Sequence, residues 1–170
     1  MILRNLKVKD APMMHEWMHD DNAVHYLRRD YAGKTLDDCI RFITEAADES
    51  ESIHFAIADD HDEYMGTVSL KHIHNTTAEL GIVLRTCAMG DGYGIFGINE
   101  IVKYGYQTHG IDTVYWCVDP DNQRAVRFYE KNGFHRFYDT EEITGYTDDE
   151  KSRYIWYRTQ RKTVNNERSV

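Results

Sequence analysis

The sequence predicts an α+β domain with a mixed, mainly antiparallel central sheet of about six to seven strands flanked by helices. Segments whose apolar residues alternate, which is typical of half-buried strands, follow one another in the middle of the chain. Segments whose apolar residues recur every three or four positions, which is typical of helices, stand before and after them. Runs of strands beside segregated helices favour this architecture. The 170 residues fit one domain, expected over 1–160, followed by a polar tail at 161–170.

The first third of the chain is expected to be mainly helical after a strand at 2–8. Asp10 has the side chain of a helix N-cap, and Pro12 follows it in the first turn. A second short helix is expected at 22–28, and a third begins at the cap residue Thr35. The apolar faces of the first and third helices comprise Met14, Trp17 and Met18, and Leu36, Ile40, Ile43 and Ala47, respectively.

The middle of the chain has the period of two that is typical of strands. Three strands are expected at 52–60, 63–73 and 77–85, and the turn residues between them favour an antiparallel meander. A helix over 92–107 and a strand over 113–119 follow. Because a strand, a helix and a strand in succession bring the two strands parallel, 77–85 and 113–119 are expected to lie parallel.

The last part of the chain continues with a helix and two further strands. The helix at 121–132 is expected to end before Gly133, since glycine is favoured just beyond a helix C-terminus. Segments 134–140 and 152–159 favour a final antiparallel pair. The connection between them, 141–151, is polar and is expected to be mobile.

Composition and charge exclude several classes of protein. The net charge of −9 argues against nucleic acid as a partner, because such binding depends on basic patches. It is compatible with a cationic substrate such as an amine, or simply with solubility. No signal peptide or membrane-spanning run is expected. Cys39, Cys87 and Cys117 are widely spaced, which favours neither a disulfide framework nor a metal site. We therefore expect a cytoplasmic protein with no membrane partner.

The stretch AMGDGYGIFG at 88–97 is the first candidate for a binding site. Gly90, Gly92 and Gly94 follow a strand and open a helix, where free N–H groups and the helix dipole favour an anion. The spacing matches neither a P-loop nor a dinucleotide-binding fingerprint. The alternative is a glycine turn in which Asp91 complements the helix dipole.

The stretch VDPDNQRAVRFYEKNGF at 118–134 is the second candidate. Asn122 stands at a helix start, and Tyr129 lies further along the same helix. Each residue also has a purely structural interpretation. Asn122 has the side chain of an N-cap, and Tyr129 can be a core aromatic residue.

Together these stretches resemble the Gcn5-related N-acetyltransferase (GNAT) family over roughly residues 1–140. The family loop Q/R-x-x-G-x-G/A aligns with 87–92, where Cys87 replaces Gln or Arg and Asp91 replaces an often basic residue. The family motif N-x-x-A-x-x-x-Y-x-x-x-G-F matches fully at Asn122, Ala125, Tyr129, Gly133 and Phe134. The opening MHEWMHDDNAVHYL is similar to the branch that acetylates protein N-termini, polyamines and nucleotide-linked amino sugars.

The resemblance implies a splayed pair of parallel strands that binds acetyl-CoA as co-substrate. The pantetheine arm would pair with the strand near Ile82 to Leu84, and an N–H near Val83 would polarise the thioester carbonyl. Tyr129 would protonate the departing thiolate. The residues expected to contact acetyl-CoA are Ile82, Val83, Leu84, Met89, Gly90, Asp91, Gly92, Tyr93, Gly94, Asn122, Ala125 and Phe128. The Asp91 carboxylate is expected to weaken this binding.

An attacking amine must lose a proton, and Glu79 is our candidate for the base. Its alternative is a solvated strand carboxylate, and a water chain could serve instead. Other family members place a glutamate on the later strand, where this chain has Cys117. His72 and His74 are expected on one strand face as exposed polar residues, since a metal site would need a third ligand.

The function predicted from these residues is transfer of acetyl from acetyl-CoA to a primary amine by direct attack. The acceptor stays open between a small amine, an amino sugar and a protein N-terminus, and Asp20, Asp21, Asp37 and Asp38 could favour a polyamine. A ping-pong route through Cys87 is disfavoured by its place in the phosphate loop. The alternative function is a non-catalytic acyl-CoA-binding module. A homodimer follows only by analogy with the family.

Overall fold

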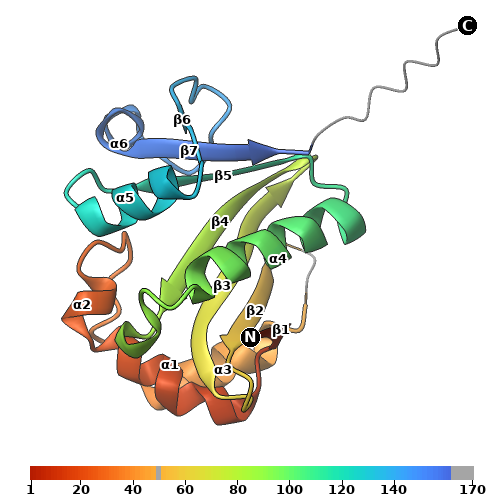
Figure 1. Cartoon of the computed structure of the whole chain (residues 1–170), viewed down its shortest axis with the longest axis vertical. Helices are drawn as coiled ribbons and strands as arrows, with labels where there is room; N and C mark the ends of the chain where they lie inside the picture. Colours follow the sequence, from red (N-terminus) through yellow and green to blue (C-terminus); the bar gives the residue numbers. More distant parts are fainter. Residues whose placement is uncertain (49–50, 162–170) are drawn as a thin grey trace, which may run out of the picture.

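The computed structural model describes residues 1–48 and 51–161 and contains one seven-stranded sheet (Figure 1). The strand order is β1-β2-β3-β4-β5-β7-β6, and every neighbouring pair is antiparallel except β4 and β5. The strands are β1 (Ile2–Asn5), β2 (Ile53–Ala58), β3 (Tyr64–His74), β4 (Thr77–Leu84), β5 (Thr113–Val118), β6 (Arg136–Phe137) and β7 (Ile155–Gln160). The predicted mixed sheet and its meander, β2 to β4, are confirmed.

Six α-helices and two 3-10 turns connect the described strands. They are α1 (Ala11–Met18), α2 (Asp21–Val24), α3 (Leu36–Glu45), α4 (Tyr93–Thr108), α5 (Gln123–Lys131) and α6 (Asp148–Arg153), with η1 at Val8–Asp10 and η2 at Thr86–Ala88. Within the described residues, no helix has the length and apolar character needed to cross a membrane.

The parallel strands β4 and β5 are paired only at their beginnings. Thr77–Glu79 of β4 pairs with Thr113–Tyr115 of β5, whereas β4 continues to Leu84 and β5 to Val118 without further pairing to each other. Figure 1 shows the two strands diverging beyond this point. We call this opening the splay. It confirms the expectation of a splayed parallel pair.

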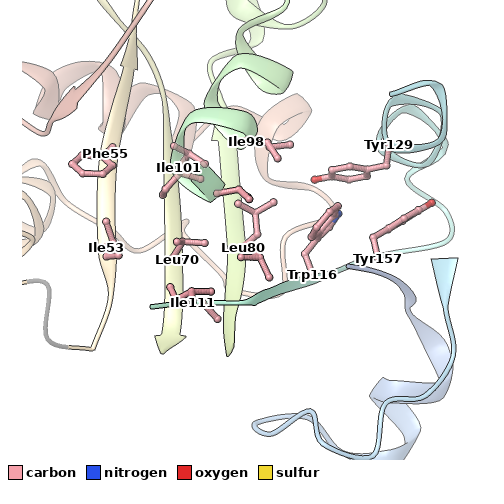
Figure 2. Packing of buried hydrophobic residues seen from close by; sticks show 14 of the residues in the cluster. Ile53, Phe55, Leu70, Leu80, Ile98, Ile101, Ile111, Trp116, Tyr129 and Tyr157 are labelled. Atoms are coloured by element: carbon pink, nitrogen blue, oxygen red, sulfur yellow. The ribbon is translucent and has the colours of Figure 1, made fainter. Parts of the chain in front are cut away.

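The two faces of the sheet are covered by different helices. One face packs against α4 and α5 in a core that includes Leu70, Leu80, Ile98 and Trp116 (Figure 2). The other face packs against α1 and α3 around residues such as Met14, Trp17, Cys39 and Tyr64. Because side chains alternate along a strand, Leu80 of β4 faces α4 while Glu79 and Val83 face the opposite side.

Several expected boundaries and caps in the N-terminal part are wrong. The predicted strand at 2–8 ends at Asn5, and η1 follows it. Asp10 occupies the N-cap position of α1 but does not cap it. Its carboxylate instead accepts the Lys7 N–H at 2.9 Å and pairs with Arg4 at 2.7 Å, because Asp10 is fully buried and needs a cation. The short helix expected at 22–28 covers only Asp21–Val24. Ala47 lies beyond the end of α3.

The connection at 141–151, for which we expect a polar and mobile segment, contains regular structure and a buried residue. Helix α6 begins within it, capped by Thr147, and Ile143 is buried. Ile143 packs with Tyr115 and Trp156 in a third small core. Only Arg136–Phe137 of the strand expected at 134–140 pairs with β7. The predicted tail at 161–170 lies outside the described residues except for Arg161.

Replacing Gly66 by Ala is expected to destabilise the fold by about 3 kcal/mol, the upper end of overpacking penalties. A Cβ at Gly66 would lie 2.4 Å from the Val83 carbonyl oxygen and 3.0 Å from Leu84 Cα, and backbone atoms yield little. The matched control is Gly33→Ala, where no atom lies within 4 Å. Thermal unfolding checks this: the melting temperature of G66A should fall by several degrees, since a chain of this size loses ~2–4 °C per kcal/mol. Equal melting temperatures for the two variants would contradict it.

Candidate active site

The glycine loop between β4 and α4 presents a row of backbone N–H groups without acceptors. Gly90 and Gly92 have φ values of 101° and 88°, which explains why glycine is needed at both positions. Gly92 is the N-cap of α4, and no side chain caps the helix. In the described residues, the N–H groups of 90–95 donate to no backbone carbonyl, whereas Met89 donates to Thr86 O at 3.2 Å. The expected anion-binding amides therefore begin at Gly90 and exclude Met89.

The Asp91 side chain is exposed at the outer turn of this loop. Main-chain N–H groups can bind an anion without a basic side chain. The absence of a lysine at this position therefore does not exclude a phosphate site, and the effect of Asp91 on affinity stays a prediction.

The edge of β4 that faces the splay has unpaired backbone groups. Arg85 donates its N–H to Met65 O of β3 at 2.9 Å, and such bonds alternate along an antiparallel pair. The backbone N–H and C=O groups of Val83 therefore point toward β3, as those of Arg85 do. Ile82 and Leu84 direct their N–H and C=O groups into the splay instead. The expected N–H near Val83 would therefore come from Ile82 or Leu84, and its contact with a ligand stays a prediction.

Helix α5 closes the second side of the splay and begins with a side-chain cap. The Asn122 Oδ1 atom accepts the Ala125 N–H at 3.1 Å, so the N-cap interpretation is confirmed. This bond uses only the amide oxygen and leaves two N–H donors on Asn122. Phe128 packs under the glycine loop, and a Cβ at Gly94 would lie 3.1 Å from Phe128 Cζ. Gly94 thus allows α4 and α5 to approach closely.

Tyr129 is a buried core residue whose hydroxyl has no partner among the residues that the structure describes. Its ring packs against Trp116 and Phe128 at centroid distances of 5.3 and 5.1 Å. Figure 2 shows its hydroxyl and that of Tyr157 pointing in opposite directions. Burial raises the pKa of Tyr129 above its ordinary value, so the phenol stays protonated at neutral pH. Such a group can donate a hydrogen bond or a proton.

Glu79 lies at the point where the splay begins, and it is a buried carboxylate rather than a solvated one. Its side chain receives hydrogen bonds from the Tyr146 hydroxyl at 3.0 Å and from Lys71 Nζ at 3.3 Å. The residue is only 7% exposed. The interpretation as a solvated strand carboxylate is therefore wrong. The two donors fix the position of a carboxylate that can accept a proton or a further hydrogen bond.

Tyr146 connects Glu79 to two further residues. The Cys117 thiol lies 3.6 Å from the Tyr146 hydroxyl, and the Arg28 guanidinium lies 4.1 Å above the Tyr146 ring. Burial raises the pKa of Tyr146, and it raises the pKa of Cys117 to about 11. Both groups are therefore protonated at neutral pH. The Tyr146 hydroxyl therefore contacts both Glu79, the candidate base, and Cys117, which occupies the position where other family members have a glutamate.

Sequence reasoning missed Tyr146, Arg28 and Lys71. The only signal for Tyr146 was an aromatic residue within an otherwise polar connection. Arg28 also donates hydrogen bonds to Gly145 O and to Glu150 at 2.9 Å each, which connects the α2–α3 segment to α6 and to the residues just before it. His72 and His74 are exposed, and a strand irregularity with φ of 50° at His72 interrupts their expected alternation.

A groove of about 570 Å³ lies on the sheet face that carries Glu79. Its floor includes Ser69 and Lys71 of β3 and Gly81 and Val83 of β4, and its walls come from α1, α3 and the segment between α2 and α3. We call it the α1–α3 groove. Because Ile82 and Val83 line it and belong to the β4 edge, the groove reaches the splay. A ligand of this volume is a small molecule or a short segment of chain.

The comparisons with known proteins agree with this geometry. A profile described as Acetyltransferase (GNAT) domain matches residues 1–135. Acetyltransferase PseH of Campylobacter jejuni is 21% identical over 129 residues, which cover 76% of this chain and 79% of that protein. The uncharacterized N-acetyltransferase p20 of Bacillus licheniformis is 22% identical over 151 residues, which cover 82% of this chain and 84% of that protein.

A solved structure shares the fold over nearly the whole chain. Spermidine N-acetyltransferase from Vibrio cholerae, in complex with CoA and spermine, superposes with a TM-score of 0.72 and 20% sequence identity over 92% of each chain. The family profile spans most of the described residues. The chain therefore belongs to the GNAT family of acetyltransferases.

Proposed function

We propose that this protein transfers the acetyl group of acetyl-CoA directly to a primary amine, with acetyl-CoA in the splay and the amine in the α1–α3 groove. The supporting observation is that several features suited to acetyl transfer lie together at the splay. An open strand edge, a row of free amide groups and the buried Glu79 lie along it, and the groove meets it from the other face. Relatives named for acetyl transfer, including one named for spermidine, support an amine acceptor.

Acetyl-CoA would be bound mainly by backbone groups. The pantetheine amides would pair with the free N–H and C=O groups of Ile82 and Leu84. The pyrophosphate would accept hydrogen bonds from the amides of Gly90 to Gly94, at the positive end of α4. The two remaining donors of Asn122, at the start of α5, would donate to the same ligand. An N–H of Ile82 or Leu84 would polarise the thioester carbonyl.

The chemical step then needs two proton transfers. The amine nitrogen attacks the thioester carbon, and Glu79 accepts the proton that the amine loses, directly or through one water. The carbon–sulfur bond breaks, and the sulfur takes a proton from the Tyr129 hydroxyl. Glu79 and Tyr129 return to their starting states by exchange with solvent. Lys71 and Tyr146 act as positioning residues that hold the Glu79 carboxylate.

Two alternatives predict different behaviour. A ping-pong route would need an acyl-cysteine, but Cys87 is exposed in η2 and faces no described base. A non-catalytic acyl-CoA-binding module would bind acetyl-CoA without turnover on any amine. The buried and hydrogen-bonded Glu79 favours the catalytic interpretation, because a module that only binds has no need of a buried carboxylate.

The cofactor site is tested by titrating the protein with acetyl-CoA in a calorimeter. Gly92→Glu should raise the Kd at least tenfold, because it places a negative charge beside the pyrophosphate amides. The matched control is Gly110→Glu, since Gly110 also has a positive φ, of 64°, and lies beyond the opposite end of α4. It should leave the Kd within twofold. Failure of the unmodified, folded protein to bind millimolar acetyl-CoA would overturn the proposal.

A further inference from the structure

The charges around the α1–α3 groove are opposite to those of the whole protein. The chain carries a net charge of −9. Among the described residues, the carboxylates that line the groove are those of Asp38 and Glu45, and the Glu79 carboxylate lies beside Lys71 on the same sheet face. Its cationic lining residues are Arg28, Arg29, Lys34, Arg41 and Lys71. A cationic cavity in an acidic protein is a local feature that overall composition does not explain.

The two carboxylates do not neutralise this lining. Asp38 is used as a capping group, because its carboxylate accepts the Thr35 N–H and hydroxyl at 2.9 Å each and pairs with Arg41. Glu45, at the end of α3, forms no ion pair with another described residue. In the described part of the chain, Arg29 and Lys34 form no ion pair. At least two cations in the groove therefore lack a counter-ion.

The behaviour of His54 supports a positive field in the groove. Burial, together with the neighbouring Lys71 and Arg29 cations, lowers the pKa of this histidine to about 4. His54 bonds Ser69 Oγ at 2.7 Å and is neutral at neutral pH. The groove charge therefore comes from the Arg and Lys side chains.

The acidic residues that favoured a polyamine do not offset these cations. Of Asp20, Asp21, Asp37 and Asp38, only Asp38 lines the groove. Asp20 caps α2 and accepts the Thr86 hydroxyl at 2.5 Å, outside the groove lining. An oligocation would meet unpaired Arg and Lys side chains, and the repulsion between like charges would disfavour its binding.

We propose, on the basis of the acetyl transfer described above, that the acceptor is a small amine that also carries phosphate. Its phosphate would be bound by Arg29 and Lys34, the two lining cations that form no ion pair in the described residues. Arginine and lysine are the residues that bind phosphate most strongly. Trp17, Tyr31 and Phe42 offer apolar ring surfaces for the rest of the molecule. The amine would then reach Glu79 next to Lys71 on the groove floor.

The test is calorimetric binding to the full chain in the presence of saturating CoA. Because saturating CoA would occupy the amide groups of the glycine loop, a phosphate-bearing probe that still binds would have to bind elsewhere, and the charge-reversal variants below test whether that place is the groove. The probes are glucosamine 6-phosphate, UDP-glucosamine, glucosamine and spermidine. A phosphate-bearing amine should bind at least tenfold more tightly than glucosamine and spermidine. The two phosphate probes distinguish a sugar phosphate from a nucleotide-linked sugar as the source of the phosphate.

Charge-reversal variants locate the binding. Arg29→Glu and Lys34→Glu should each weaken the phosphate probe at least tenfold and leave the Kd of CoA within twofold. Lys103→Glu makes the same change in net charge on α4, across the sheet, and should change neither value. Tighter binding of spermidine than of both phosphate probes, or no effect of the two reversals, would overturn the inference. Loss of CoA binding by the unmodified protein would overturn the proposed function itself.

Discussion

Replacing Glu79 by Gln is expected to lower kcat for acetyl transfer about 100-fold, the lower range for loss of a general base. Gln has the same shape and its amide oxygen still accepts the Tyr146 hydrogen bond, but it cannot take the proton of the attacking amine. The KM for acetyl-CoA should change less than threefold, because the Glu79 side chain lies on the groove face of the sheet, whereas acetyl-CoA is proposed to pair with backbone groups of Ile82 and Leu84 along the β4 edge. Thiol release measured under saturating conditions gives kcat.

The pH dependence separates a base from a structural residue. In the Gln variant the bound amine must already be neutral, so its kcat should rise with pH until the amine is deprotonated. A purely structural defect would lower kcat equally at all pH values. The matched control is Glu130→Gln, which removes an exposed ion pair with Arg136 and should leave kcat unchanged. A kcat within threefold of the unmodified protein for E79Q would rule out the base role.

The parts of the candidate site that are encoded by a few consecutive residues could be predicted from the sequence. The glycine loop could be predicted because positive φ values at Gly90 and Gly92 and the start of α4 are encoded within a few residues. The cap of α5 at Asn122 was likewise local. The parallel pairing of β4 and β5 followed from the general handedness of strand–helix–strand units.

The surroundings of Glu79 could not be predicted, because they depend on distant contacts. Tyr146 lies 67 residues from Glu79 along the chain, and its segment looked like a polar loop. The orientation of Ile82, Val83 and Leu84 depends on which residues of β3 they pair with, and a single strand does not reveal that register. The cation-lined groove is formed by residues from α3, β3 and the α2–α3 connection, which only the fold brings together. The acidic overall composition instead favoured a cationic acceptor.

Replacing Tyr129 by Phe is expected to lower kcat about 100-fold, with the KM for acetyl-CoA unchanged within threefold. The substitution removes the one hydroxyl proposed to protonate the CoA thiolate. It keeps the ring that packs on Trp116 and Phe128, so the melting temperature should stay within ~2 °C of the unmodified protein, as expected for a change that leaves core volume intact. Thiol release and thermal unfolding, measured on the same preparation, check both parts.

The same aromatic cluster contains its own control. The Tyr157 hydroxyl is buried without a hydrogen-bond partner in the described residues and points away from that of Tyr129 (Figure 2). Tyr157→Phe removes the same atom from the same cluster, so kcat should not fall, and stability should stay equal or rise because an unsatisfied polar group is lost. If both variants lose activity equally, cluster packing and not proton donation explains the effect. Full activity of Y129F would instead mean that water protonates the thiolate, and Tyr129 would be a core residue alone.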